Sequence, residues 1–436
     1  MTISELNFLI SAEGKLLLER YASYDEAALF RLLLKSTKKR GSVKVKNTGN
    51  SDIKIIENSY LSAAVTLIKL RRQAFGKFKY SEKMFFTPLG LEQSTNENIS
   101  RYIAARFKAN WKIVDLTCGI GGNLIFLAEH CRQVLAIDKN ELNLICARAN
   151  SALYNEDKKI EFILGDAQEE VAKLIEKAES NEKLKNVDAF FLDPARDRIG
   201  KSKTRSILNS QPALLEILPK IFKITKNVGV KISPAFDYRE LDLLPEKPEV
   251  EVISENNTNK VVMLWFGDLK TVDRRGTIIN KNSAISYTNF TNQVDTEELH
   301  PNFVNFVERP LAYLYEPNKA IIKAHLVDEL AIKYDLAKIN PHLSFLSSEK
   351  RIKPDSPDLW RVFKVLACDL FSWSVLQKFI SERRLDKVNI ITKRFPLKPE
   401  EVYKKLKIKE GSDLFLILTV LGDEKRCFIL AEREQK

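Results

Sequence analysis

The chain has 436 residues, of which 44% are hydrophobic, so it is too long for one compact domain and has enough apolar side chains for about two to four. Its 70 Lys and Arg outnumber its 58 Asp and Glu and leave a formal net charge of +12, which favours an anionic partner such as nucleic acid, although a basic proteome background produces the same balance. The five cysteines show no CxxC or zinc spacing, no secretory signal opens the chain, and no apolar run approaches the roughly 20 residues of a membrane helix. We therefore expect a reduced, cytoplasmic protein without a membrane segment or a metal site.

Residues 1 to about 80 carry leucines and alanines at three-to-four spacing, as between Leu17 and Leu33, and this predicts a helical N-terminal domain. The polar stretch Asn47 to Ser51 interrupts it. A later predicted helix, Ala63 to Lys79, carries the basic residues Lys69, Arg71, Arg72, Lys77 and Lys79. These five indicate either a solvated face or a helix that contacts phosphate beside the active site.

The next segment leads into a glycine-rich turn. Ser94 and Glu97 have the spacing of a capping box and predict a helix that continues to about Phe107. After it, the run Trp111 to Leu116 predicts a strand, and DLTCGIGGN, residues 115 to 123, places three glycines within four residues before helical spacing resumes. Such a turn lets a ligand approach the backbone, so that the amides of the following helix face it.

Four successive predicted strands each end near a carboxylate, the first of them at Asp115. The later strands and their carboxylates are Gln133 to Ile137 with Asp138, Ile160 to Leu164 with Asp166, and Val187 to Leu192 with Asp193. Asp138 stands 23 positions after Asp115, close to the distance at which a nucleotide-binding βαβ unit places an acid on ribose hydroxyls. An open parallel sheet binds its ligand at this edge, and the spacing fits either a dinucleotide or an adenosyl cofactor.

The remaining elements complete an α/β core and a C-terminal region. The core elements predicted after Asp193 are a helix at Pro212 to Phe222, a strand at Gly229 to Ser233, and a closing pair, Val250 to Ser254 and Val261 to Phe266, around the turn 256 to 259. The fold class is therefore α/β and doubly wound. Lys270 to Asn282 is rich in charge and marks a boundary.

Two α+β units are predicted beyond this boundary. The first contains the helix Lys319 to Ala331, and the polar stretch Ser347 to Pro357 is predicted to be a linker. The elements predicted for the second are a strand at Val388 to Thr392, a helix after Pro399, and strands at Leu414 to Leu421 and Arg426 to Ala431. Basic residues around RFPL, including Lys393 and Arg394, make this unit the candidate RNA-binding module.

The motifs resemble those of a known enzyme class. DLTCGIGGN is similar to the first motif of the class I S-adenosylmethionine-dependent methyltransferases, particularly as it occurs in RNA cap guanine-N2 methyltransferases, the trimethylguanosine synthases. The whole chain resembles a bacterial group of methyltransferases with a ferredoxin-like segment and a THUMP-like domain after the catalytic core. The stretches that carry this resemblance are FFTPLGLEQST (85 to 95), LDPARD (192 to 197), KISPAFDY (231 to 238), YLYEPN (313 to 318) and ITKRFPL (391 to 397).

This resemblance implies a domain order and a cofactor. The implied domains are a helical N-terminal domain (1–80), a methyltransferase domain with a seven-stranded Rossmann-like sheet (81–270), a ferredoxin-like segment (271–346) and a THUMP-like domain (347–436). S-adenosylmethionine is the implied cofactor, and an RNA, either tRNA or rRNA, is the implied partner. The sequence carries no signal for an oligomeric state.

The resemblance also implies roles for single residues. Asp115 would orient the amino-acid end of the cofactor, Asp138 would hold the ribose from a solvent-facing position, and Asp166 would bind the adenine amino group. The glycines would let backbone amides reach the cofactor carboxylate. The complete set implied for the cofactor is Asp115, Thr117, Cys118, Gly119, Gly121, Gly122, Asn123, Asp138, Lys139, Asp166 and Ala167. Contacts to cofactor or substrate are implied for Phe86, Gln93 and Thr95, for which ordinary capping and packing is an equally good explanation.

Asp193-Pro194-Ala195-Arg196 corresponds to the loop that holds the methyl acceptor. Amino-directed methyltransferases usually have Asp or Asn, two prolines and an aromatic residue there, and this chain keeps only Asp193 and Pro194. Arg196 can stack on a base or bind phosphate. RNA 5-methyluridine enzymes need a cysteine nucleophile after the next strand, where Lys231 to Ala235 contains none. A base amine such as guanine N2 is therefore favoured, with Asp193, Pro194 and Arg196 as catalytic residues.

Two functions of other classes stay open at this point. A nucleotide-dependent oxidoreductase typically has G-x-G-x-x-G, whereas this chain has G-x-G-G. An RNA-binding protein with a catalytically inactive methyltransferase core is the other alternative, because Arg196 departs from the usual acceptor loop.

Overall fold

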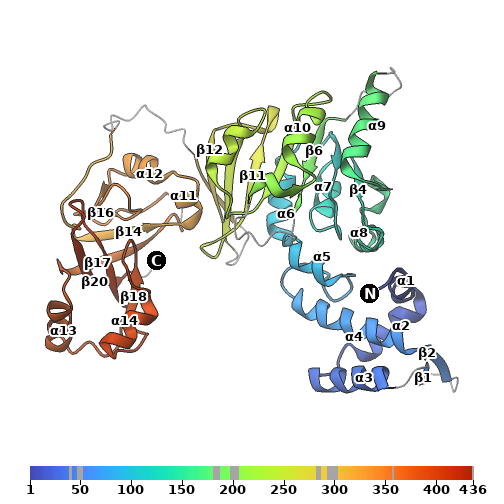
Figure 1. The fold of residues 1–436 in the computed structure, drawn as a ribbon, viewed down its shortest axis with the longest axis horizontal. Helices are drawn as coiled ribbons and strands as arrows, with labels where there is room; N and C mark the ends of the chain where they lie inside the picture. Colours follow the sequence, from blue (N-terminus) through green and yellow to red (C-terminus); the bar gives the residue numbers. More distant parts are fainter. Residues whose placement is uncertain are drawn as a thin grey trace. The chain divides into compact units, whose positions relative to one another are not determined.

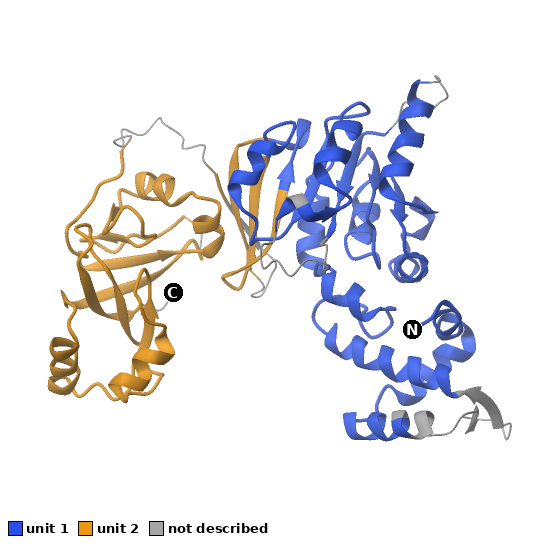
Figure 2. Ribbon diagram, in the orientation of Figure 1, with its two compact units in different colours: residues 1–248, 264–270 blue, residues 249–263, 271–436 orange. Residues whose placement is uncertain are grey.

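The structure, a computed structural model, describes residues 1–38, 42–46, 53–179, 187–196, 206–280, 286–291, 303–355 and 358–434. The chain forms two compact units, Met1–Pro248 with Leu264–Lys270 and Glu249–Met263 with Thr271–Lys436 (Figure 2). Within the described ranges, no helix is both long enough and apolar enough to cross a membrane.

The N-terminal part of the first unit contains helices and one pair of strands. Its helices are α1 (Ile3–Ile10), α2 (Ala12–Tyr21), α3 (Glu26–Lys38) and α4 (Asn58–Gln73). Between α3 and α4, β1 (Ser42–Lys46) pairs antiparallel with β2 (Ile53–Glu57). The prediction of a purely helical domain missed this pair, because the alternating pattern of SVKVK and IKIIE is too short to outweigh the helical spacing on either side. The predicted break at 47–51 lies outside the described residues.

Two short helices lead from α4 to the core. They are α5 (Pro88–Gln93), with Thr87 as its N-cap, and α6 (Glu97–Ala104). The predicted capping box was wrong, since the Asn96 side chain caps α6 by accepting from the Ile99 amide at 3.0 Å. Ser94 instead donates its hydroxyl to the Leu91 carbonyl at 3.0 Å, because it ends a helix that the sequence reading had missed.

The core is a nine-stranded sheet with the order β13-β12-β10-β11-β9-β6-β3-β4-β5. Its strands are β3 (Lys112–Asp115), β4 (Gln133–Asp138), β5 (Ile160–Leu164), β6 (Ala189–Leu192), β9 (Val228–Ile232), β10 (Glu249–Glu255), β11 (Thr258–Trp265), β12 (Arg274–Asn280) and β13 (Ser286–Thr291). The strands β5, β4, β3, β6 and β9 run parallel to their neighbours in that row. The doubly wound α/β class is thus confirmed.

The sheet is two strands larger than the seven that the resemblance implied. β12 continues it parallel to β10, and β13 pairs antiparallel with β12. The predicted boundary at Lys270 to Asn282 contains the division between the two units, which falls after Lys270, but it also contains β12, where Thr277, Ile278 and Ile279 are β-branched and buried. The charged start of this strand is paired, since Arg275 binds the buried Glu249 at 2.8 Å.

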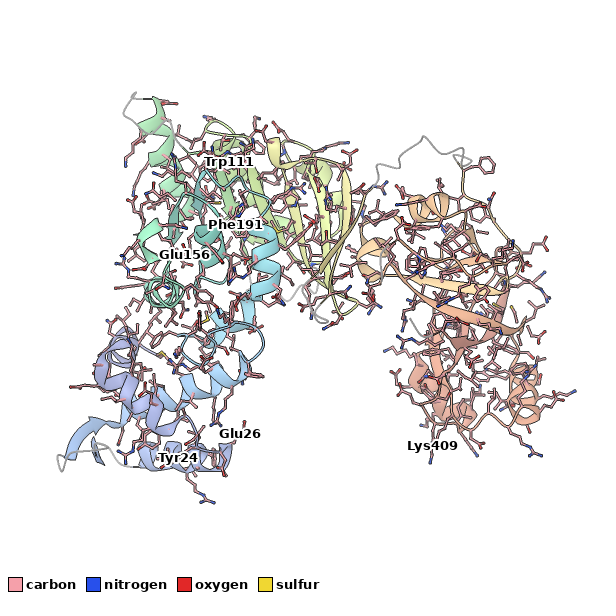
Figure 3. All side chains as sticks on the ribbon, turned by 180° about the vertical axis from the view of Figure 1, so that it is seen from behind. Tyr24, Glu26, Trp111, Glu156, Phe191 and Lys409 are labelled. Atoms are coloured by element: carbon pink, nitrogen blue, oxygen red, sulfur yellow. The ribbon has the colours of Figure 1, made fainter. Side chains whose placement is uncertain are left out.

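Helices α7 (Leu124–His130), α8 (Glu141–Leu153), α9 (Ala167–Glu179) and α10 (Leu214–Ile221) lie alongside the sheet (Figure 1). An aromatic cluster fills part of the core of this unit. Phe107 packs edge-on against Phe191 and Trp265, with ring centroids 6.4 and 5.8 Å apart, and Figure 3 labels Phe191 on β6. Phe107 and Trp265 also pack on Gly229 of β9, where a Cβ would lie 3.2 and 2.6 Å from them. The rings therefore pack against both β6 and β9, whose carboxyl ends hold residues of the site described below.

The second unit also contains a seven-stranded sheet with the order β15-β16-β14-β17-β20-β19-β18. Its strands are β14 (Tyr313–Pro317), β15 (Ala337–Lys338), β16 (Leu346–Ser348), β17 (Trp360–Leu370), β18 (Asn389–Thr392), β19 (Leu414–Val420) and β20 (Arg426–Arg433). The helices are α11 (Lys319–Lys323), α12 (Val327–Lys333), α13 (Trp373–Glu382) and α14 (Pro399–Leu406).

Two predictions for this region were wrong in detail. The single helix Lys319 to Ala331 is broken, because His325 adopts a φ of 57° that no α-helix continues through. The linker predicted from Ser347 begins inside β16, where the Ser347 hydroxyl donates to the Tyr313 carbonyl at 2.7 Å. The polar residue Ser347 suggested a linker in the sequence, but in the structure it belongs to a paired strand of the sheet.

Candidate active site

The carboxyl ends of β3, β4, β5 and β6 bring the four predicted carboxylates to one edge of the sheet. Asp115 is in register with Ala136 on one side and Phe191 on the other, and Asp138 is in register with Leu164. Asp193 follows β6 directly, and Asp166 stands two positions after the last residue of β5. The sequence predicted this arrangement from strand ends alone.

The glycine turn between β3 and α7 is open toward this edge. Gly119 has a φ of +55°, and a Cβ at this position would meet no atom within 4 Å. Gly121 has a φ of +95°, which a side chain would strain. Gly122 leaves little space for a side chain, since a Cβ added there would lie 3.1 Å from the Ser94 Cβ. The turn is thus packed on one side and accessible at Gly119.

Asp115 carries an unsatisfied acceptor. Its side chain is 1% exposed, and Oδ1 accepts from the Thr117 amide at 3.1 Å, while Oδ2 is buried without a hydrogen-bond partner within the described chain. Burial, reinforced by the negative charges of Asp193 and Asp138, raises the pKa of this carboxyl to about 8. A buried acceptor without a donor costs free energy, which a ligand with an N–H group would recover.

Asp138 is more enclosed than the sequence predicted, since a solvent-facing side chain was expected. Its Oδ2 accepts from the Gly119 amide and its Oδ1 from the Asn140 amide, both at 2.8 Å. Both oxygens also accept from Asn143 Nδ2 at 3.3 Å. Burial raises the pKa of the Asp138 carboxyl, opposed by these donors. The prediction missed this enclosure because amides of two turns converge on the side chain.

The other residues implied for the cofactor divide into buried and exposed groups. Thr117 Oγ1 accepts from the Asp193 amide at 2.6 Å, which joins the glycine turn to the loop after β6. Cys118 is buried, and Asn123 Oδ1 accepts from the Ser100 hydroxyl at 3.0 Å. Two residues are exposed: Lys139, whose ammonium donates to Gln211 Oε1 at 3.3 Å, and Asp166, which accepts from the Gln168 amide at 2.8 Å. Ala167, the first residue of α9, is buried.

The segment before α5 is fastened to the glycine turn by Asn150 of α8. The fully buried Asn150 accepts from the Phe85 amide at 2.7 Å and donates to the carbonyls of Phe85 and Ile120 at 2.9 Å. Phe86 has no exposed surface and packs in the core, so its ring is not accessible for the contact with a ligand that the resemblance implied. Gln93 is exposed. Thr95 is buried, and its hydroxyl lacks a hydrogen-bond partner among the described residues.

The loop after β6 holds an ion pair that the sequence reading did not foresee. Asp193 Oδ2 accepts from the ammonium of Lys231 on β9, and the two side chains are 26% and 12% exposed. Pro194 follows, and β7 (Ala195–Arg196) pairs antiparallel with β8 (Ser210–Gln211). The Arg196 side chain lies outside the described residues, so its two proposed roles stay predictions.

The basic residues 69–79 form neither a wholly solvated face nor a free phosphate-binding helix. Arg71 donates to the carbonyls of Met84 and Lys83 at 2.9 Å, and burial lowers its pKa to about 10. Arg72 donates to the Ala22 carbonyl at 2.9 Å. Lys77 donates to the Leu91 carbonyl at 2.7 Å, and burial together with the positive charge of Lys231 lowers the pKa of its ammonium to about 8.

Lys393 and Arg394, predicted to bind substrate, both contact carboxylates of the second unit. Lys393 lies 3.3 Å from Glu316, and Arg394 lies 3.0 Å from Glu424. Two residues that the sequence reading missed organise the first unit: Lys231 and Asn150. A lysine within the apolar strand VGVKI and an asparagine inside a helix were the available signals, because both residue types are costly there without a partner.

Comparisons with known proteins agree with this geometry. Residues 110–268 match the family model of RNA cap guanine-N2 methyltransferases, residues 313–353 that of a ferredoxin-like domain, and residues 360–433 that of a THUMP domain-like family. A Mycobacterium tuberculosis protein named an uncharacterized S-adenosylmethionine-dependent methyltransferase is 24% identical over 363 residues, which are 81% of this chain and 91% of the relative.

Two further matches bear on the core and on the fold. A Clostridium acetobutylicum protein named an uncharacterized RNA methyltransferase is 26% identical over 183 residues, 41% of this chain and 38% of that protein. A crystal structure of a Porphyromonas gingivalis W83 protein, 22% identical, covers 94% of this chain and all of its own with a TM-score of 0.71, which shows a shared fold. The oxidoreductase alternative is thereby set aside, and the chain is an S-adenosylmethionine-dependent methyltransferase with ferredoxin-like and THUMP-like domains after its catalytic core.

Proposed function

We propose that this enzyme methylates RNA and that the acceptor is a base amine, with guanine N2 favoured. The family model matched by residues 110–268 and the name of the Clostridium relative support an RNA substrate. The observation that carries the proposal is the Asp193 carboxylate, which Lys231 holds beside the buried Asp115 at the end of the sheet. The order of domains given above is part of the same proposal.

The residues at this edge fit the cofactor. When bound, S-adenosylmethionine supplies a methyl group activated by a sulfonium. Asp115 Oδ2, which lacks a donor, is suited to accept from an ammonium, and the open backbone at Gly119 admits a carboxylate beside the start of α7. Asp138 and Asp166 stand at the next two strand ends, where ribose hydroxyls and an adenine amino group are expected.

Asp193 is assigned to the acceptor amine. Its Oδ2 is occupied by Lys231, whereas Oδ1 makes no hydrogen bond within the part of the chain that the structure describes. The lone pair of a base amine is delocalised into the ring, so an acceptor that holds its hydrogens directs the nitrogen toward the methyl group and receives the proton. Lys231 acts as a positioning residue, because it fixes the carboxylate plane.

A lysine cluster on the THUMP-like domain is the proposed RNA-binding surface, in place of the carboxylate-paired Lys393 and Arg394. The cluster comprises Lys387, Lys404, Lys407 and Lys409, all exposed and without an ion pair among the described residues. Val388 donates its amide to the Lys409 carbonyl at 3.0 Å, which brings two of these segments together, and Figure 3 labels Lys409 at one end of the unit. Phosphate contacts of this kind are independent of base sequence.

The test is transfer of a labelled methyl group to total RNA from cells that lack the gene, followed by mass spectrometry of the nucleosides. We expect N2-methylguanosine with the wild-type enzyme and none with Asp193→Ala. A methylated pyrimidine carbon would contradict the amine assignment. RNA binding without any methyl incorporation would favour the inactive-core alternative.

A further inference from the structure

The turn after α4 presents an aromatic ring to solvent. The side chain of Phe75 is 87% exposed, and the next value among the exposed large hydrophobic side chains of the described residues is 67%, for Phe303. Its neighbours are anchored, since Ala74 has no exposed surface and Phe78 is 4% exposed. Exposing a phenyl ring this far gives up most of the free energy that its burial would contribute.

The turn that carries Phe75 is fixed at several points. Lys77 donates its amide to the Ala74 carbonyl and accepts at its own carbonyl from the Glu97 amide, both at 2.9 Å. Glu97 also accepts from the Lys79 amide at 2.7 Å. Gly76, with a φ of +74°, permits the sharp reversal that turns Phe75 outward while Phe78 packs inward. The ring is therefore held on a rigid frame, which reduces the entropy lost when it binds a ligand.

Contacts within the first unit connect this turn to the glycine turn of the candidate site. Phe75 stands two residues before Lys77, a separation of at most about 7 Å along the backbone. The Leu91 carbonyl accepts from the Lys77 ammonium at 2.7 Å and from the Ser94 hydroxyl at 3.0 Å, and a Cβ on Gly122 would lie 3.1 Å from the Ser94 Cβ. Phe75 thus belongs to the segment that packs against the glycine turn, at the margin of the candidate site.

The chemistry around the ring suits a nucleic acid strand. Lys79 is exposed, and its ammonium lies 4.9 Å from the centre of the Tyr80 ring. Cations next to an exposed aromatic side chain form the combination that binds phosphates and stacks unpaired bases. The acceptor loop contributes no aromatic residue of its own among Asp193 to Arg196.

We propose that Phe75 is a stacking platform for an unpaired base that flanks the target nucleotide. The inference rests on the proposed RNA substrate and adds a binding contact that none of the matched motifs contains. Because every base has a π-face, this contact tolerates different bases and contributes affinity rather than sequence specificity.

The test compares full-length wild type with Phe75→Ala, Phe75→Trp and Phe303→Ala, using total RNA from cells that lack the gene as substrate. Phe75→Ala should raise the apparent KM for RNA by about 5- to 150-fold, the loss expected for one stacked base, and leave kcat and cofactor affinity nearly unchanged. Phe75→Trp should restore the KM to about the wild-type value. Phe303→Ala is the matched control, since it removes an exposed phenyl ring from the second unit.

Two outcomes would overturn the inference while the RNA methyltransferase function stands: an unchanged KM in Phe75→Ala, or a KM that Phe75→Trp fails to restore. An equal loss in Phe303→Ala would also count against it, because any exposed ring would then have the same effect. If wild type neither binds nor methylates RNA, the proposed function fails and the inference fails with it.

Discussion

The carboxylate of Asp193 and the ammonium of Lys231 form an ion pair between two neighbouring parallel strands, 38 positions apart in the chain. Both groups are largely buried, so removing one leaves the other with an uncompensated charge. We expect Lys231→Met to lower kcat by about 10- to 100-fold, because the acceptor carboxylate loses its orientation. Cofactor affinity, measured by calorimetry, should change little, and Lys231→Arg should recover part of the turnover.

Lys226→Met provides the matched control for this prediction. Lys226 pairs with Glu246, but the two side chains are 53% and 40% exposed. An exposed pair of this kind contributes about 0–1 kcal/mol and has no connection to the acceptor loop. If Lys226→Met and Lys231→Met reduced kcat equally, the positioning role of Lys231 would be refuted.

Cofactor affinity should depend on pH through Asp115. Its pKa of about 8 in the free protein means that the carboxyl is mostly protonated at pH 7, whereas an ammonium requires the carboxylate as partner. Binding must then release a proton, so affinity should rise by up to about tenfold per pH unit from pH 6 to 8 and level off above. Calorimetry in two buffers of different ionisation enthalpy measures this proton release directly.

Asp115→Asn separates this effect from other titrations. The neighbouring charges of Asp138, Asp193 and Lys231 remain, so a pH dependence that persists in the variant belongs to one of them. The raised pKa also makes the stability of the free protein depend on pH. The contribution of Asp115 to the free energy of unfolding is fully present below its unfolded pKa near 3.8 and is lost as the pH rises through about 8. Without cofactor, Asp115→Asn should therefore have a higher melting temperature than wild type at pH 8, and it should bind the cofactor less tightly.

Asp193→Asn keeps the shape of the acceptor side chain and removes its charge. If Asp193 holds the amine hydrogens and receives the proton, turnover should fall by roughly 10²-fold or more with little change in cofactor affinity. Single-turnover methyl transfer measures this step. Asn forms the same turn before Pro194, so near-normal turnover would mean that Asp193 only shapes the loop.

Asp138→Ala should weaken cofactor binding and also lower stability. The side chain accepts from two backbone amides and from Asn143, and a mostly buried donor left without its acceptor costs about 1–3 kcal/mol. Thermal denaturation and calorimetry on the same samples separate the two effects. Asp138→Asn retains part of the hydrogen bonding and should be the milder variant. An alanine variant with wild-type affinity would exclude Asp138 from the ribose site.

RNA affinity should depend on the lysine cluster. Lys387→Ala with Lys409→Ala should weaken binding and reduce the slope of log affinity against log salt by roughly two, about one for each phosphate that is no longer neutralised. The comparison variant, Lys393→Ala with Arg394→Ala, removes cations already paired with Glu316 and Glu424 and should change the slope less. The reverse order of effects would restore the RFPL segment as the RNA-binding element.

The sequence predicted the parts of this protein that depend on local pattern. Strand ends and glycine spacing were sufficient to locate Asp115, Asp138 and Asp193 at one edge of a parallel sheet. Contacts between distant residues were not predictable in this way. Lys231 meets Asp193, and Asn150 joins Phe85 to Ile120, only because the sheet and α8 bring together segments far apart in the chain.

The sequence reading also misjudged where polar residues indicate boundaries. Ser94 looked like a cap, but it ends α5, since the capping position three residues before Ile99 belongs to Asn96. The charges near Arg275 suggested a boundary, and the two units do divide after Lys270, but a buried glutamate neutralises this arginine and lets β12 join the sheet. This glutamate lies 26 positions from Arg275 in the chain, so no local pattern could identify it.

β14 and β17 belong to regions matched by two different family models, but they pair antiparallel from Tyr313↔Lys364 to Pro317↔Trp360. Separating these strands would expose the backbone edge of β17 from Trp360 to Lys364, and an unpaired strand edge recruits other chains and promotes aggregation. The ferredoxin-like and THUMP-like regions should therefore unfold together in a single cooperative transition. During evolution they would be inherited as a pair, because neither could be transplanted to another protein without its neighbour's strand.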